Sequence, residues 1–82
     1  MMASWAAGGE SKTAKMVCAD ISVGGLRMEA EEPVPVGAYI QLSAEEIDFR
    51  GSAVVRYSIP AGSKFAVGLS LTPETSDEIF GM

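Results

Sequence analysis

The segment with the clearest chemical potential is Asp20-Ile21-Ser22-Val23-Gly24-Gly25, where a carboxylate and a hydroxyl stand two residues apart beside a double glycine. At the end of a strand, Asp20 and Ser22 share one face, because alternate side chains of a strand point the same way. A carboxylate can accept two hydrogen bonds from the N–H donors along the edge of a purine. A hydroxyl and bare glycine N–H groups can approach a phosphate closely. The segment therefore predicts a site for an anionic ligand that carries a base.

The same residues also have a purely structural interpretation. Asp and Ser commonly cap turns through hydrogen bonds to their own backbone. The pair Gly24-Gly25 is typical of a hairpin turn, because glycine adopts positive φ without a steric penalty. Spacing alone leaves both interpretations open.

Composition excludes most enzyme chemistry. The chain has 82 residues, no histidine and a single cysteine, Cys18. Catalytic triads, Cys/His zinc sites and disulfides within the chain are therefore excluded, and we expect no enzymatic activity. One unpaired cysteine fits a reducing cytoplasm, and its place in an apolar run predicts that Cys18 is a small core residue.

Charge and hydropathy limit the partners. The net charge is −5, but residues 1–27 carry three basic and two acidic side chains, so an anionic ligand is best received there. No basic stripe is adequate for DNA or RNA. The uncharged run 33–44 contains two prolines and a glycine and is shorter than a membrane span, so we expect no membrane insertion.

Short runs separated by turn residues predict an all-β domain. Residues 1–11 read as a flexible N-terminal leader with Trp5 as its one large apolar residue, and 12–82 as the folded domain. A proline-containing connector is expected over 31–37, and a short C-terminal helical turn after Thr72-Pro73, where Thr75 and Glu78 have capping-box spacing. Six strands are expected, over residues 13–20, 26–30, 39–42, 47–50, 51–59 and 65–71.

The motif and its surroundings resemble the PilZ domains of bacteria. The family signature (Asp/Asn)-x-Ser-x-x-Gly is filled by Asp20, Ser22 and Gly25. The flanking text VCADISVGGLRMEAEEPVPVGAYIQLS, and then GSAVVRYSIPAGSKFAVGLSL, is similar to the run of strands that follows this motif in the family. The resemblance extends over residues 15–71.

This resemblance implies a fold, a ligand and a set of contacts. The implied fold is a small antiparallel six-stranded β-barrel, complete or lacking its first strand. The implied function is a non-enzymatic signalling module that binds the second messenger cyclic di-GMP and uses no cofactor. Asp20 and Ser22 would contact the ligand and Gly25 would shape the turn, with Gly24 and Arg27 as further candidate ligand residues. Arg27 and Arg56 lie on the polar faces of their strands, where each can reach a phosphate or stay solvated.

One family feature is absent, and it opens an alternative. The Arg-x-x-x-Arg motif that precedes the Asp motif in PilZ domains has no counterpart, because only Lys12 and Lys15 precede Asp20 as basic residues. Lysine lacks the planar fork with which arginine stacks and pairs. We therefore expect weak binding of cyclic di-GMP. The alternative is a ligand-blind adaptor that binds a protein partner.

The short stretch ahead of the Asp motif also bears on oligomeric state. A barrel whose first strand is short or missing exposes a row of unpaired backbone groups. A second copy can cover such an edge, which predicts a homodimer through a strand edge.

Overall fold

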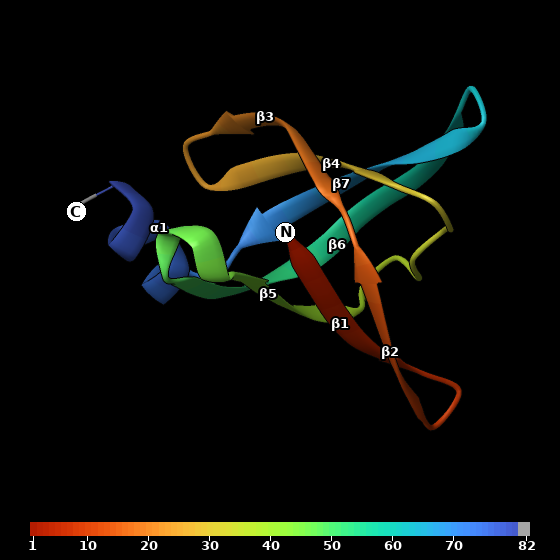
Figure 1. Cartoon of the computed structure of the whole chain (residues 1–82), viewed down its shortest axis with the longest axis horizontal. Helices are drawn as coiled ribbons and strands as arrows, with labels where there is room; N and C mark the ends of the chain where they lie inside the picture. The colour runs from red at the N-terminus through yellow and green to blue at the C-terminus, as the bar shows by residue number, and fades with distance from the viewer. Residues whose placement is uncertain (81–82) are drawn as a thin grey trace.

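The computed structural model describes the backbone of residues 1–80 and the side chains of residues 1–76. It consists of seven strands, one 3-10 turn and one short helix (Figure 1). In chain order these are β1 (Met2–Ala7), β2 (Glu10–Lys15), β3 (Val17–Ser22), β4 (Gly25–Ala30), β5 (Tyr39–Ala44), η1 (Glu45–Ile47), β6 (Phe49–Ala61), β7 (Lys64–Leu71) and α1 (Pro73–Phe80). The predicted predominance of antiparallel β-structure is confirmed.

The strands form one antiparallel sheet in the order β2-β1-β5-β6-β7-β4-β3. The prediction of a six-stranded barrel is wrong in two respects, because there are seven strands and the sheet does not close. The segment predicted as one strand over 13–20 is divided at Met16, whose side chain is buried. Met16 exchanges two backbone hydrogen bonds with Met1, at 2.8 and 3.0 Å, and the chain continues directly into β3, the strand at the other end of the sheet order (Figure 1).

The N-terminal segment belongs to the sheet. The structure differs here from the expected flexible leader, since β1 lies between β2 and β5 and pairs with both. Gly8 and Gly9 have φ of 60° and 82° and make the turn between β1 and β2. Ala3 and Trp5 are buried, and burial of the indole fixes β1 against the core.

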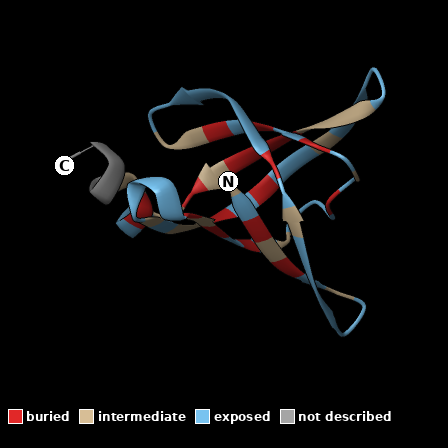
Figure 2. Ribbon diagram, viewed as in Figure 1, coloured by how far each residue is buried: buried red, intermediate tan, exposed pale blue. Residues whose placement is uncertain are grey.

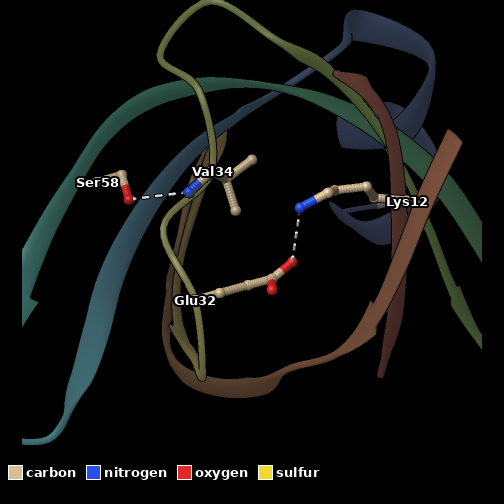
Figure 3. Close-up of polar contacts among 4 residues, drawn as sticks. All are labelled: Lys12, Glu32, Val34 and Ser58. Atoms are coloured by element: carbon tan, nitrogen blue, oxygen red, sulfur yellow. Dashed lines mark hydrogen bonds and ion pairs between the residues drawn. The ribbon is translucent and has the colours of Figure 1, made fainter. Parts of the chain in front are cut away.

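Buried and exposed residues alternate along β1, β4 and β5 (Figure 2), and the buried residues of these strands, β6 and β7 form one core. The connector 31–37 closes one end of this core. Val34 is buried there, and its N–H donates to Ser58 Oγ at 3.2 Å (Figure 3). Glu32 Oε1 lies 3.9 Å from Lys12 Nζ, so the connector is also linked to β2 (Figure 3). The predicted proline-containing connector between β4 and β5 is confirmed.

Three further differences concern single elements. β6 is one strand of 13 residues where two strands were predicted, since Gly51 continues the ladder with β5. Cys18 is exposed on β3 rather than buried, because β3 is an edge strand with a bulge at Ala19. A helix begins at Pro73 as expected, but Thr75 lies inside it and bonds to β6, and the side chain of Glu78 lies outside the described residues.

Ion pairs lie at the surface, beside the end of β4. Lys64 Nζ is 3.3 Å from Glu29 Oε1 and 3.5 Å from Glu31 Oε1. The hydrogen bond to Glu29 and the two negative charges raise the pKa of Lys64 above its ordinary value of 10.5. All three side chains are open to solvent, so their contribution to stability is small.

Candidate functional site

Four residues from four strands form a row across the outer face of the sheet. Asp20 on β3 is paired with Arg27 on β4, Arg27 with Gly68 on β7, and Gly68 with Tyr57 on β6. Directly paired residues of an antiparallel sheet point to the same face, so Asp20, Arg27 and Tyr57 share it. Register, and not nearness in sequence, brings these side chains together.

Two bulges set this row. The pairing of β3 with β4 shifts between Cys18 and Asp20, and that of β6 with β7 shifts between Val55 and Tyr57. A bulge leaves one residue unpaired and increases the local twist of its strand. The residue left over on β6 is Arg56, an exposed guanidinium beside Tyr57. The bulges therefore place a second arginine next to the row.

The row lies in a groove of about 520 Å³. Ser22 and Gly25 are paired one step further along the sheet and belong to the same groove. The complete lining is Asp20, Ser22, Gly25, Leu26, Arg27, Arg56, Tyr57, Gly68 and Leu69. Of the residues predicted from the sequence, Asp20, Ser22, Gly25 and Arg27 are thus brought together. Gly24 lies outside the lining, in the turn before β4.

The two adjacent glycines have different roles. Gly24 has φ of 79°, so the left-handed residue of the turn is Gly24 and not Gly25. A Cβ on Gly25 would lie 3.3 Å from the carbonyl oxygen of Leu69 and 3.5 Å from Ser22 Oγ. Gly25 therefore keeps the groove open beside the Ser22 hydroxyl, where a larger side chain would crowd the floor.

The charges of the groove are available to a ligand. Among residues 1–76, neither Arg27 nor Arg56 lies within 4 Å of a carboxylate oxygen, and both are exposed. Asp20 Oδ1 accepts a hydrogen bond from the N–H of Ile21 at 2.9 Å. The groove thus holds two guanidinium groups without a carboxylate partner among the described side chains, one carboxylate, and the side chains of Ser22 and Tyr57. That set suits an anion that also carries hydrogen-bond donors.

The Tyr57 ring lies against the backbone of Gly68. A Cβ added to Gly68 would overlap Cε2 of the ring and would lie 2.5 Å from Cδ2 and Cζ. The ring therefore fills the space that a side chain on β7 would occupy, and it is 38% exposed toward the groove. An exposed aromatic face held in this way is a platform for a flat group.

Sequence reasoning missed the contribution of β6 and β7. Arg56 was weighed as a phosphate contact, but Tyr57 and Gly68 were not connected with Asp20. The available signal was the glycine that interrupts the large apolar residues of β7, Val67-Gly68-Leu69, because a strand glycine often marks a close approach by another group.

A second hollow, of about 380 Å³, lies over β1, β2, β5 and the start of β6. It includes Glu45 and Asp48 from the acidic cluster around η1. Across the described part of the chain, no three acidic or cysteine side chains gather closely enough to hold a metal ion. The groove beside Asp20 is the better candidate because it brings two guanidinium groups together with the predicted residues Asp20 and Ser22, whereas the second hollow has one arginine, Arg50, beside two carboxylates.

Comparisons with known proteins give no match, whether against family models, curated proteins or solved structures. Within the described residues, no helix is both long enough and apolar enough to cross a membrane. Function is therefore inferred from the groove and from the sequence motif that lines it.

Proposed function

We propose that the chain is a non-enzymatic signalling module of the PilZ type that binds cyclic di-GMP in the groove over β3, β4, β7 and β6. The observation that carries the proposal is the convergence of Asp20 and Ser22 with the guanidinium groups of Arg27 and Arg56 on one outer face. A cyclic dinucleotide presents anionic phosphates and guanine edges together, and this groove offers partners for both.

Each groove residue has a distinct role in this proposal. The Asp20 carboxylate accepts the two adjacent N–H donors of a guanine edge and gives up its local bond to Ile21 in exchange. Arg27 and Arg56 bind phosphate oxygens through charge-assisted hydrogen bonds. The Tyr57 ring stacks on a base, and the Ser22 hydroxyl donates to a phosphate.

Binding is expected to be weak. The family's paired arginines precede the Asp motif, and this chain has none there. Loss of two guanidinium contacts at about 1.5–3 kcal/mol each lowers affinity by roughly 10²–10⁴. Arg27 and Arg56 stand on the strands under the ligand and recover part of this loss, so the dissociation constant should stay above about 1 μM.

Calorimetric titration with cyclic di-GMP tests the proposal. Asp20→Ala and Ser22→Ala should each abolish the heat of binding, while the far-UV circular dichroism stays that of the parent. Matched controls are Glu46→Ala on η1 and Ser11→Ala on β2, which remove an exposed carboxylate and an exposed hydroxyl outside the groove. Binding by Asp20→Ala and Ser22→Ala as tight as that of the parent would refute the proposed site.

The alternative function is a ligand-blind adaptor, and one surface feature favours it. Large apolar side chains are exposed along the outer face of β6 and beside it on β5, namely Val54, Tyr57, Ile59 and Tyr39. Tyr39 and Val54 are directly paired, so the stripe is continuous across the two strands. A titration without heat, together with unchanged amide resonances for residues 20–27 at millimolar ligand, would reject the cyclic di-GMP proposal in favour of this adaptor.

A further inference from the structure

The two edges of the sheet differ in how well they are protected. β2 carries Glu10, Lys12 and Lys15, and charged side chains, lysine above all, discourage pairing with another strand. β3 has a single charge, Asp20, and every one of its residues is exposed. Figure 1 shows β3 at the margin of the molecule, at the end of the sheet order.

Apolar side chains are exposed along this unprotected edge, on both faces of the strand. Val17 and Ile21 on β3 are 58% and 51% exposed, and Val23 in the adjoining turn is 81% exposed. Ile21 is paired with buried Leu26, so its side chain points to the core side of the sheet but extends beyond the core. A strand added next to β3 would cover the Ile21 side chain.

The backbone of Ile21 is also free for such a strand. Its N–H bonds to the Asp20 carboxylate of its own strand at 2.9 Å, which is a local substitute for a ladder partner. In an antiparallel strand the N–H and C=O of one residue point to the same side, so a partner strand can exchange two bonds with Ile21.

We propose that a second copy of this chain pairs with β3 edge to edge, about a two-fold axis through Ile21. In this register Ile21 faces Ile21 of the second copy, and Asp20 faces Ser22 of the second copy on the outer face. Each Ile21 N–H donates to the other Ile21 carbonyl, and the released Asp20 carboxylate accepts the facing Ser22 hydroxyl. The backbone hydrogen bonds, the apolar contact and the side-chain hydrogen bonds thus each form between the same residues of the two copies, as a two-fold axis requires.

Charge and symmetry favour a second copy with this register. Opposing Asp20 to Ser22 avoids placing two carboxylates directly opposite each other. The acidic pairs Glu31-Glu32 and Glu45-Glu46 lie in the connector and in η1, away from the edge of β3. An isologous contact closes on itself, whereas pairing of β3 with β2 of another copy would continue into a fibre.

The contact adjoins the groove. Asp20 and Ser22 line both the groove and the proposed interface, and each Ser22 hydroxyl has one proton, so it donates either to a ligand phosphate or to Asp20 of the second copy. A six-residue edge buries less than the roughly 1,000 Å² expected of a stable interface, so the dimer should be weak, with a dissociation constant in the high micromolar range.

Sedimentation equilibrium up to millimolar protein tests the proposal. The parent should show a monomer–dimer equilibrium, and Ile21→Lys should weaken it by about tenfold or more, since an edge lysine opposes strand pairing. The matched control is Thr13→Lys, an exposed residue on the other edge, which should leave the equilibrium unchanged. A parent that stays monomeric, or a loss of association with Thr13→Lys, would overturn it.

A distance measurement tests the register without altering Ile21. Cys18 is the single cysteine and is exposed on β3, so a nitroxide can be attached to it. Three residues on either side of the axis, at about 3.3 Å each, put the two Cys18 Cα atoms roughly 20 Å apart. Pulsed dipolar spectroscopy should find a distance near this value in concentrated protein. A single population of label-to-label distances near 40 Å, about twice the expected value, would exclude pairing through β3.

Discussion

At the scale of single residues, the groove depends on small side chains as much as on charged ones. Gly68 and Gly25 lack the Cβ atoms that would push Tyr57 aside and crowd Ser22. Arg27 and Tyr57 are both paired with Gly68, and the Tyr57 ring occupies the space over β7 that a side chain at this position would take. Glycine at these two positions shapes the groove, although strand glycines usually weaken a sheet.

Because Tyr57 lies against Gly68, the effect of Gly68→Ala on the free energy of unfolding should change sign when Tyr57 is removed. Gly68→Ala should destabilise the parent by about 1 kcal/mol, because the new Cβ displaces the Tyr57 ring. In a Tyr57→Ala background the same substitution should stabilise by roughly 0.5–1 kcal/mol, since alanine loses less backbone entropy than glycine. A double-mutant cycle by urea denaturation measures both effects. Equal effects in the two backgrounds would mean that the ring does not rest on Gly68.

The sequence predicts the groove residues that lie close to Asp20 in the chain and misses those that lie far from it. Asp20, Ser22 and Gly25 are close in the chain, so a local motif predicts them together, and the structure places all three in one groove. Arg27 follows two residues after Gly25, and its exposed face could be inferred from the alternation of β4. Tyr57 and Gly68 are separated from Asp20 by dozens of residues and meet it only through three strand registers and two bulges. No local pattern contains that information.

At the scale of elements, α1 is held to the sheet by hydroxyl groups. Thr75 Oγ1 accepts a hydrogen bond from the N–H of Ser52 on β6 at 2.9 Å and another from Thr72 Oγ1 at 2.9 Å. Ser52 Oγ lies 3.0 Å from Thr72 Oγ1 and completes the network. Gly51 leaves room for Thr75, since a Cβ there would be 2.5 Å from Thr75 Cγ2.

Removal of one hydroxyl should therefore loosen the helix. Thr75 is 4% exposed, and Thr75→Val keeps its shape while leaving the N–H of Ser52 without its acceptor; the Thr72 hydroxyl can still bond to Ser52 Oγ. We expect a loss of about 1–3 kcal/mol in the free energy of unfolding. The control Thr13→Val, on the exposed edge strand β2, should change stability by less than about 0.5 kcal/mol. Equal stabilities of the two variants in urea denaturation would contradict this role of Thr75.

Elements were predictable where side chains alternate clearly. β4, β5 and β7 have large apolar residues at every second position, and all three were predicted within a few residues. β1 alternates too, with Ala3 and Trp5 inward, but alanine has a low strand propensity and hides the period. Gly8 and Gly9 lie inside the predicted flexible leader, but with positive φ between two strands they form a hairpin turn.

At the scale of the whole molecule, the N-terminal strand completes the wall around the core. β1 occupies the second place in the sheet order and joins β2 to β5. Trp5 is its largest inward side chain and is 4% exposed. Its indole N–H has no hydrogen-bond partner among the described residues, so the contribution of Trp5 comes from the burial of its ring.

Truncation of this ring should nearly unfold the protein. A chain of 82 residues has a free energy of unfolding of about 4–8 kcal/mol, and a buried Trp→Ala change costs about 3–5 kcal/mol. Trp5→Ala should therefore populate the unfolded state markedly at 25 °C, whereas Tyr39→Ala on neighbouring β5, an exposed aromatic, should cost less than about 1 kcal/mol. Far-UV circular dichroism in urea is the suitable measurement, because Trp5 is the only tryptophan and its fluorescence is lost in the variant. If Trp5→Ala were as stable as Tyr39→Ala, residues 1–11 would be the flexible leader that composition suggests. The large loss in the free energy of unfolding is expected because β1, at the start of the chain, helps to enclose the core.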